Sequence, residues 1–353
     1  MNDHHIIVIG TSAGGMPALC QLVAQLNNTL PAAVLVVQHL APDSWGAHLV
    51  ERMARHTSMR CQLAVDGTPI ELGNIYLAPP DRHLLVRDGH ILITRGPREN
   101  HYRPAVDSLF RSAAAYYSTR VIGVVLTGML HDGTAGLEFI KRCGGRALVQ
   151  DPADAEYPGM PESALHNVEI DDVLPISLMG ARLEELVFQN VQPVWPVPED
   201  IKLEAAIAER VVGTGTTEEA SQLGHTVPVT CPDCGGSLWQ MKHGKILRYR
   251  CHTGHAFTAD SLLKESQKSL EESLWVALRM LEERKTLLTN MAIRGEGSSN
   301  GSQQERIEEI KKHINRLREF MLNGMSNSAV PGPRPPGPVL TPDDDDLELA
   351  AEA

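Results

Sequence analysis

The 353-residue sequence lacks three features that would direct it to a membrane or to nucleic acid. It has no apolar run long enough to cross a bilayer, and no secretory leader, because an apolar strand begins at about residue 6. It has no basic excess, since 32 Lys and Arg stand against 44 Asp and Glu for a formal net charge of −12. We therefore expect a cytoplasmic protein with no membrane insertion and no nucleic-acid partner.

Phosphate-binding signatures are also missing from the first strand and its turn, residues 6–15. Residues 6–9 form an apolar β-branched run, which is typical of a strand buried on both faces, and an apolar-periodic helix is predicted over 17–26. The turn between them has neither G-x-G-x-x-G nor a Walker lysine. It instead fits G-x-S-x-G, which exposes a serine at a strand-to-helix turn. Ser12 is then either the cap of the helix or a nucleophile.

Strand and helix patterns alternate over residues 1–190, which we assign to one domain. Asp88-Gly89 between two apolar runs predicts a hairpin. The alternation predicts an α/β fold with a doubly wound, Rossmann-like and mostly parallel sheet, of which the hairpin is an elaboration. Strands are predicted over 32–38, 60–65, 74–78, 83–86, 90–94, 121–126 and 147–150, and helices over 44–56, 104–117, 134–142, from 161 and over 178–188.

The composition changes after residue 190. Three prolines within 192–198 predict a stiff linker, assigned to 191–224, with a short amphipathic helix over 201–212 and a loose polar connection over 213–224. Two amphipathic helices over 259–323 predict a helical hairpin or coiled coil that offers a surface for self-association. The Pro-rich and acidic tail, 324–353, is predicted to be disordered.

Three of the six cysteines cluster within a small module over 225–258. In a reducing compartment such a cluster is typical of a metal site rather than of disulfides, and no βαβ pattern surrounds the C-x-x-C turn to favour a redox pair. We predict a zinc-ribbon-like, structural Zn²⁺ site with three thiolates and one imidazole as ligands. The predicted ligands are Cys231, Cys234, Cys251 and His255, with His252 as the alternate and His225 and His243 as weaker candidates.

Polar residues follow three predicted strands of the sheet. Ser12 follows the first strand, His39 the second, and Asp132 the strand over 121–126. Ligands of open parallel sheets lie at the carboxyl ends of the strands, so these side chains are expected to meet. Taken separately, His39 is interpreted as a strand-end histidine and Asp132 as a helix cap. Taken together with Ser12, the residues favour a catalytic triad in which Ser12 is the nucleophile.

Residues 1–190 resemble the catalytic domain of the bacterial chemotaxis receptor methylesterases, the protein-glutamate methylesterases. The resemblance rests on short motifs spread in order over the domain: Ile9-Gly10-Thr11-Ser12-Ala13-Gly14-Gly15, Val37-Gln38-His39, Tyr76-Leu77-Ala78-Pro79, Arg103-Pro104-Ala105-Val106-Asp107-Ser108-Leu109-Phe110, Leu126-Thr127-Gly128-Met129, Asp132-Gly133 and Gly159-Met160-Pro161.

The resemblance implies a role for each matching residue. The family's nucleophile falls on Ser12, its base on His39 and its orienting acid on Asp132. Met129 matches the position whose backbone N–H serves the oxyanion, and Ala13 stands beside the nucleophile where many members have threonine. Arg103 and Met160 are expected on the substrate side of the site, as a further implication of these motifs.

The implied activity is hydrolysis of glutamate γ-methyl esters on chemotaxis receptor-like proteins, together with deamidation of the equivalent glutamine, without a catalytic cofactor. Methylated receptors are the expected partners, and a receptor methyltransferase or sensory kinase is a further one. The family's receiver domain normally precedes the catalytic domain, whereas this sequence starts at the catalytic strand, so the resemblance gives no ground to expect control by aspartyl phosphorylation within it. The alternative hypothesis is a non-catalytic signalling adaptor that retains the esterase fold.

Overall fold

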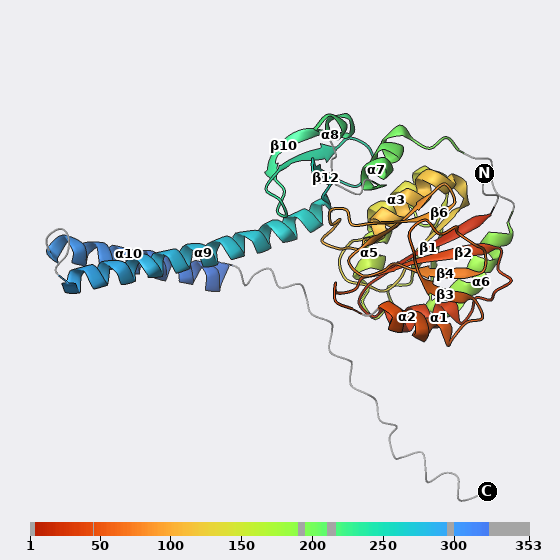
Figure 1. Ribbon diagram of the computed structural model, residues 1–353, viewed down its shortest axis with the longest axis horizontal. Coiled ribbons are helices and arrows are strands. Elements are labelled where there is room, and N and C mark those ends of the chain that lie inside the picture. Colours follow the sequence, from red (N-terminus) through yellow and green to blue (C-terminus); the bar gives the residue numbers. More distant parts are fainter. Residues whose placement is uncertain (1–3, 45, 190–194, 210–216, 295–299, 325–353) are drawn as a thin grey trace, which may run out of the picture. The chain divides into compact units, whose positions relative to one another are not determined.

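The computed structural model describes residues 4–44, 46–189, 195–209, 217–294 and 300–324 (Figure 1). The chain divides into two compact units, Met1–Gln267 and Lys268–Ala353. The predicted tail from residue 325 onward, and residues 191–194 and 210–216 of the predicted linker, lie outside the described residues.

Seven parallel strands form the central sheet of the first unit. Their order is β3-β4-β2-β1-β7-β8-β9, so β1 lies inside the sheet with β2 on one side and β7 on the other. This arrangement confirms the predicted α/β fold with a parallel sheet. The strands are β1 (His5–Thr11), β2 (Ala32–Gln38), β3 (Arg60–Leu63), β4 (Asn74–Leu77), β7 (Val121–Val125), β8 (Arg146–Gln150) and β9 (Asp172–Leu174).

Helices cover both faces of this sheet, as Figure 1 shows. Successive side chains of a strand point to opposite faces, so an all-apolar strand must bury both. Ile6 and Val8 enter the core shared with α3, α4 and α5, whereas Ile7 and Ile9 enter the core shared with α1, α2 and α6. These helices are α1 (Gly15–Val23), α2 (Gly46–Ala54), α3 (Val106–Tyr117), α4 (Thr134–Arg142), α5 (Gly159–Asn167) and α6 (Ile176–Phe188).

The predicted hairpin is present as β5 (His83–Arg87) and β6 (His90–Thr94). Asp88 and Gly89 at its tip have φ of 46° and 78°, the pair of positive values that a type I′ turn requires. The three-residue strand β9 was not predicted, because it is too short to show a period. α3 begins two residues after the predicted start at Pro104, for a reason that lies in the candidate site.

The rest of the first unit holds a second, antiparallel sheet. α7 (Glu199–Glu209) and α8 (Thr217–Leu223) precede β10 (Gly224–Thr230), β11 (Ser237–Met241), β12 (Arg248–Cys251) and β13 (Ala256–Thr258). The prediction of a loose connection over 213–224 is wrong for residues 217–224. Ala220 and Leu223 fold into a helical turn because they pack against Trp239 and Met241.

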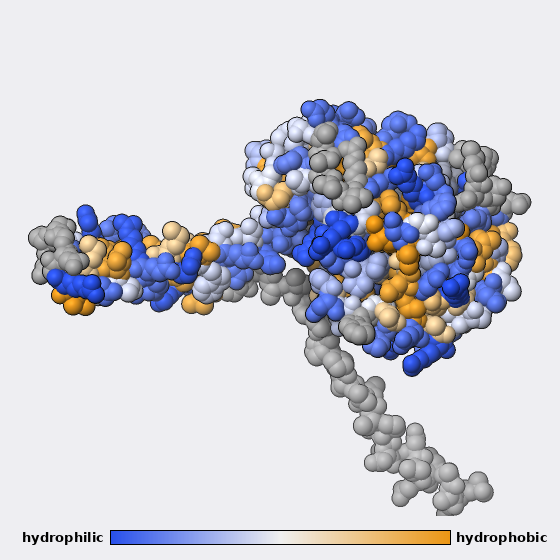
Figure 2. All heavy atoms as spheres, viewed as in Figure 1, coloured by the Kyte–Doolittle hydropathy of each residue, from blue (hydrophilic) through white to orange (hydrophobic). Residues whose placement is uncertain are grey.

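The second unit contains the later turns of α9 (Ala259–Arg294) together with α10 (Asn300–Gly324). The two helices pack through Leu278, Ile310 and Ile314, and Arg318 pairs with Glu282 at 2.7 Å. Figure 2 shows hydrophobic patches between hydrophilic ones along these helices, and Trp275, Met280 and Ile293 are among the exposed apolar side chains. No helix of the described residues is long and apolar enough to span a bilayer.

Candidate functional site

Three predicted site residues lie at the carboxyl edge of the central sheet. Ser12 follows β1, His39 follows β2, and Asp132 lies in the loop between β7 and α4. Because β1 has β2 and β7 as its two neighbours, the loops that leave these strands meet at the point where strand order switches. The sheet therefore places all three residues at one edge, as predicted.

The turn that carries Ser12 is fixed by its backbone. The Ser12 N–H donates to the Thr127 carbonyl at 3.1 Å, and Gln38 Nε2 donates to the Ser12 carbonyl at 2.8 Å. A Cβ on Gly128 would lie 2.9 Å from Ser12 Cβ, so only glycine allows this close approach. Gly14 is the N-cap of α1, and no side chain caps that helix. The interpretation of Ser12 as a helix cap therefore receives no support.

His39 and Asp132 form a buried pair. His39 Nε2 lies 2.8 Å from Asp132 Oδ2, with side chains that are 4% and 0% exposed. A carboxylate only accepts hydrogen bonds, so Nε2 donates the proton of this bond, and in the neutral form of the ring the lone pair is on Nδ1. Among the described residues, Nδ1 is buried without a hydrogen-bond partner. Tyr102 stacks on the imidazole, with ring centroids 3.6 Å apart and an interplanar angle of 8°. The ring is thus oriented to accept a proton at Nδ1.

Asp132 caps a helix, but not the helix that follows it. Its Oδ2 accepts the Val106 N–H at 2.6 Å and its Oδ1 accepts the Asp107 N–H at 3.2 Å, both in the first turn of α3. These bonds explain why α3 begins at Val106 rather than at Pro104: the carboxylate satisfies the first free N–H groups of the helix. Asp132 therefore takes part in both interpretations, as a helix cap and as the partner of His39.

Asp107 makes the reciprocal cap. Its Oδ1 accepts the N–H groups of Gly133 and Gly136, at 3.0 and 2.6 Å, at the start of α4. Burial raises the pKa of Asp107, and the negative charge of Asp132 raises it further, to about 8. The first turn of α3 is thus bound by Asp132, which precedes α4, and the first turn of α4 is bound by Asp107 of α3. Together these hydrogen bonds fix the position of Asp132 beside His39.

Two backbone N–H groups near Ser12 are available to a ligand. Within the described part of the chain, neither the Ala13 N–H nor the Met129 N–H is used in a hydrogen bond, whereas the Gly128 N–H donates to the Tyr157 carbonyl at 2.9 Å. Met129 is 48% exposed. A donor beside the nucleophile and a second donor from a neighbouring loop are the parts of an oxyanion hole.

Arg103 and Met160 are held by other groups. Arg103 binds Asp81 through Nη2 at 2.6 Å and Nε at 2.9 Å, and Nη1 donates to the Gly96 carbonyl at 2.8 Å. Met160 is fully buried, and its N–H donates to the Gly128 carbonyl at 2.9 Å. The structure joins neither to the three predicted triad residues by a hydrogen bond, and their substrate-side role stays a prediction.

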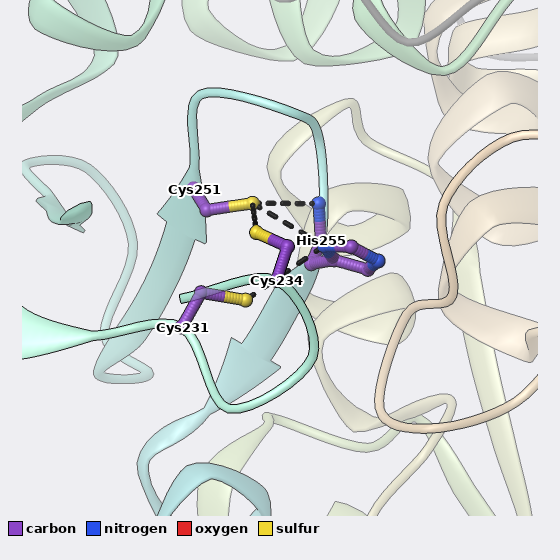
Figure 3. A group of neighbouring side chains, drawn as sticks. All are labelled: Cys231, Cys234, Cys251 and His255. Atoms are coloured by element: carbon purple, nitrogen blue, oxygen red, sulfur yellow. Dashed lines mark hydrogen bonds between the residues drawn. The ribbon is translucent and has the colours of Figure 1, made fainter. Parts of the chain in front are cut away.

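The predicted cysteine and histidine ligands converge in the antiparallel sheet (Figure 3). The three Sγ atoms and a ring nitrogen of His255 all lie within 4.8 Å of one another. Cys234 Sγ is 3.9 Å from Cys251 Sγ, and His255 Nδ1 is 3.7 Å from Cys231 Sγ and 3.4 Å from Cys251 Sγ. A tetrahedral Zn²⁺ with Zn–S bonds of about 2.3 Å requires ligand atoms about 3.8 Å apart. The donor set therefore fits a closed metal site.

The surroundings of His255 also fit a metal ligand. Its Nε2 lies 3.7 Å from Asp233 Oδ2, the kind of carboxylate that orients a ligating imidazole. The alternate His252 does not join the cluster; its ring lies edge-on to Trp239, with centroids 6.3 Å apart. His225 and His243 are not in the cluster either, within the residues that the structure describes.

A buried charge network joins the antiparallel sheet to the parallel-sheet domain. Arg111 of α3 makes a bidentate pair with Glu99 at 2.5 and 2.9 Å, and Arg248 of β12 makes another with Glu204 of α7 at 2.9 and 2.9 Å. Arg250 bridges them, 3.3 Å from Glu204 and 3.7 Å from Glu99. Burial opposes ionisation of both carboxyls, but the guanidiniums outweigh it and hold the pKa of Glu99 and of Glu204 at about 2.

Replacing Glu204 with glutamine is expected to lower the free energy of unfolding by about 3–5 kcal/mol, because Arg248 and Arg250 then keep buried charges without their carboxylate. The matched control is Glu199→Gln on the same helix. The Glu199 side chain is 87% exposed and, among the described residues, forms an ion pair only with Lys202, so the cost of this change is expected below about 1 kcal/mol. Denaturant unfolding measures both. Equal effects of the two variants would contradict a stabilising role for the network.

The same network makes the free energy of unfolding depend on pH. Both carboxyl pKa values are depressed in the folded chain, so their contribution is complete above the unfolded value of 4.5 and is lost as the pH falls toward about 2. Denaturant unfolding repeated at about pH 3 should therefore show a smaller difference between the wild type and Glu204→Gln than at neutral pH.

Sequence reasoning missed the support that three residues give to the site. Asn100 and Tyr102 were not identified, and the helix-capping role of Asp107 was not predicted. Asn100 Nδ2 donates to Asp107 Oδ2 at 2.7 Å and to Asp132 Oδ1 at 3.1 Å. The available signal was the polar and aromatic segment that precedes α3. The residues that they support or cap, His39, Asp132 and Gly133, come from distant segments, so no local pattern assigns these contacts.

The arrangement matches one known family. The model of the CheB methylesterase family matches residues 7–183, half of the chain. A putative protein-glutamate methylesterase/protein-glutamine glutaminase of Leptospira interrogans serogroup Icterohaemorrhagiae serovar copenhageni is 37% identical over 193 residues, which cover 54% of this chain and 98% of that protein. The chain therefore belongs to the CheB methylesterase family, which confirms the resemblance seen in the sequence.

Other relatives match the same region. A protein-glutamate methylesterase/protein-glutamine glutaminase 2 of Anaeromyxobacter dehalogenans is 38% identical over 181 residues, 51% of this chain and 53% of that protein. The crystal structure of the Thermotoga maritima CheB methylesterase catalytic domain matches with a TM-score of 0.51 and 34% identity, over 53% of this chain and 100% of that one. The chain spans about half the length of several curated relatives that it matches.

Proposed function

We propose that this protein is a serine-type hydrolase that removes methyl groups from glutamate γ-methyl esters on chemotaxis receptor-like proteins. The observation that carries the proposal is the buried His39–Asp132 pair at 2.8 Å, placed at the sheet edge that also carries Ser12. The names of the relatives support the substrate class. Residues 1–190 are proposed as the catalytic domain and residues 225–258 as the metal-binding module.

In the proposed reaction, Ser12 Oγ attacks the ester carbonyl and its proton passes to His39 Nδ1, while Asp132 stabilises the imidazolium through Nε2. The N–H groups of Ala13 and Met129 bind the oxyanion of the tetrahedral intermediate. Collapse of the intermediate breaks the ester C–O bond, and methanol leaves with the proton from His39. Water then attacks the acyl-enzyme with His39 again as base, which releases glutamate and restores Ser12. A glutamine amide follows the same path and releases ammonia.

The second hypothesis, a non-catalytic adaptor, requires no catalytic geometry. The buried histidine whose Nε2 faces Asp132 and whose Nδ1 has no partner among the described residues, and the unused N–H groups beside Ser12, favour the enzyme. Methanol release from a methylated receptor fragment tests the proposal, with the unmethylated fragment as control. Release above that control is the expected result; its absence with folded, metal-loaded protein would favour the adaptor.

We propose that Cys231, Cys234, Cys251 and His255 bind a structural Zn²⁺. The convergence of three thiolates and one imidazole supports this assignment, since four protein ligands leave no open position for substrate. The metal therefore takes no part in the proposed hydrolysis and supplies folding free energy to a small sheet.

Cys234→Ser is expected to lower the bound zinc from one per chain to nearly none, because an alcohol does not replace a thiolate ligand. Elemental analysis of the purified chain measures the zinc content. The matched control is Cys61→Ser, a half-buried thiol outside the cluster, which should keep the metal. Wild-type protein that is well folded and free of metal would contradict the site.

We also propose that the exposed apolar side chains of α9 and α10, such as Trp275 and Met280, serve self-association. A receptor methyltransferase or sensory kinase remains a proposed partner. This proposal comes from the family's role in signalling, and we assign the partner to no surface of the described residues.

A further inference from the structure

Residues 99–102, here called the bridging loop, contact the candidate catalytic residues on one side and the metal-binding module on the other. Glu99 pairs with Arg111 of α3 and lies 3.7 Å from Arg250 of β12. The Asn100 N–H donates to the Ala256 carbonyl of β13 at 2.9 Å. The loop therefore lies between β13 and the catalytic edge of the parallel sheet.

Asn100 is the central residue of this loop. Its amide is 5% exposed and uses its full hydrogen-bonding capacity. Nδ2 donates to Asp107 and to Asp132, while Oδ1 accepts the Thr258 N–H at 3.1 Å and the Ser261 hydroxyl at 3.1 Å. One side chain thus links the proposed orienting acid to the segment where β13 ends and α9 begins.

The neighbours of Asn100 reinforce this link. Tyr102 stacks on His39. His101 contacts α9 twice, through Nδ1 at 3.3 Å from Glu265 Oε2 and through Nε2 at 3.4 Å from the Ser261 carbonyl. Each residue of the loop therefore contacts the candidate catalytic residues, the module or the start of α9.

The loop conformation depends on these contacts. Asn100 and His101 have φ of 49° and 74°, a left-handed backbone conformation that residues other than glycine rarely adopt. Such residues persist when the surroundings fix them. Without β13 and the start of α9, Asn100 Oδ1 and the Asn100 N–H lose every partner that the structure gives them, and the amide is no longer held against Asp132.

We propose that Asn100 is a positioning residue through which the metal-loaded module holds Asp132, so that hydrolysis depends on a metal that does not touch the substrate. This inference rests on the proposed esterase function and adds a regulatory role for the C-terminal module. The catalytic domain then depends on the metal site for full activity. The two regions on either side of the proline-rich linker would therefore not function independently of each other.

The test compares full-length wild type and Asn100→Ala, each with zinc bound and after removal by a chelator. Zinc removal is expected to lower kcat of the wild type by about 10²-fold, with KM little changed, because a small displacement of a catalytic group has this effect. Asn100→Ala should show a similar loss with zinc bound and little further loss without it. Unchanged wild-type kcat after zinc removal, or equal losses in both chains, would overturn the proposal.

A second variant covers the case in which Asn100→Ala or the metal-free chain unfolds. Ser261→Ala removes a single hydrogen bond to Asn100 Oδ1 and is expected to lower kcat about fivefold, whereas Ser261→Thr keeps the hydroxyl and should restore it. Equal kcat for these two variants would overturn the link through Ser261.

A readout that does not need turnover separates this inference from the proposed function. The proton that His39 Nε2 shares with Asp132 gives a downfield NMR resonance, which zinc removal and Asn100→Ala should shift or broaden. An inactive wild type whose resonance still responds to zinc would refute the esterase and support the positioning role. A resonance that is indifferent to zinc and to Asn100→Ala would overturn the positioning role whether or not the chain is active.

Discussion

Ser12→Ala is expected to lower methanol release from a methylated receptor fragment by about 10⁴-fold or more, because the change removes the attacking oxygen and leaves the base with no proton to take. The fold should remain intact. The turn is held by the Ser12 N–H and carbonyl, which alanine keeps, and the hydroxyl caps no helix.

The matched control is Ser177→Ala on the first turn of α6, an exposed serine that follows the outermost strand β9 rather than β1. It should release methanol at the wild-type rate. A Ser12→Ala chain that retains more than about a tenth of wild-type activity would show that another group attacks the ester, since loss of a true nucleophile costs orders of magnitude.

Asp132→Asn is expected to lower kcat by about 10⁴-fold while KM changes little, because an amide no longer fixes the His39 proton on Nε2 or stabilises the imidazolium. A stability loss should accompany it, since Asp132 also accepts the N–H groups of Val106 and Asp107. Activity must therefore be expressed per folded molecule, with the folded fraction taken from thermal unfolding.

Asp171→Asn separates these two effects. Asp171 is a partly buried carboxylate that also accepts a backbone N–H, that of Ala147 at 2.8 Å, and pairs with Lys141 and Arg146 away from the sheet edge. It should lose stability and keep kcat. If Asp132→Asn behaved in the same way, Asp132 would be only the cap of α3.

The central fold was predictable because its signal is local. An all-apolar strand such as Ile6–Ile9 must be covered on both faces, and the alternation with helices then gives a parallel sheet. The positions of Ser12, His39 and Asp132 followed from that sheet, since Ser12 and His39 come directly after β1 and β2, and Asp132 lies in the loop that leaves β7. The four metal-ligand candidates were predictable for a related reason, because the ligand types and their spacing are visible along the chain.

The support of the site was not predictable, because it depends on contacts between segments far apart in sequence. A cap of the helix that follows it was the alternative interpretation of Asp132, but its carboxylate accepts the N–H of Val106 in α3, 26 residues earlier in the chain. Nothing near Asn100 indicates that Thr258 and Ser261 are its partners. The helix over 217–223 escaped prediction because packing against Trp239, rather than a local period, stabilises it.

The most direct test of the central claim is peptide mass spectrometry of a methylated receptor fragment after incubation with the full-length, zinc-loaded chain. We predict that each susceptible glutamate ester loses the mass of one methylene group in the presence of wild type or Ser177→Ala, and keeps it in the presence of Ser12→Ala. Unchanged esters with folded wild type, or equal conversion by Ser12→Ala, would contradict the assignment of this protein as an esterase that acts through Ser12.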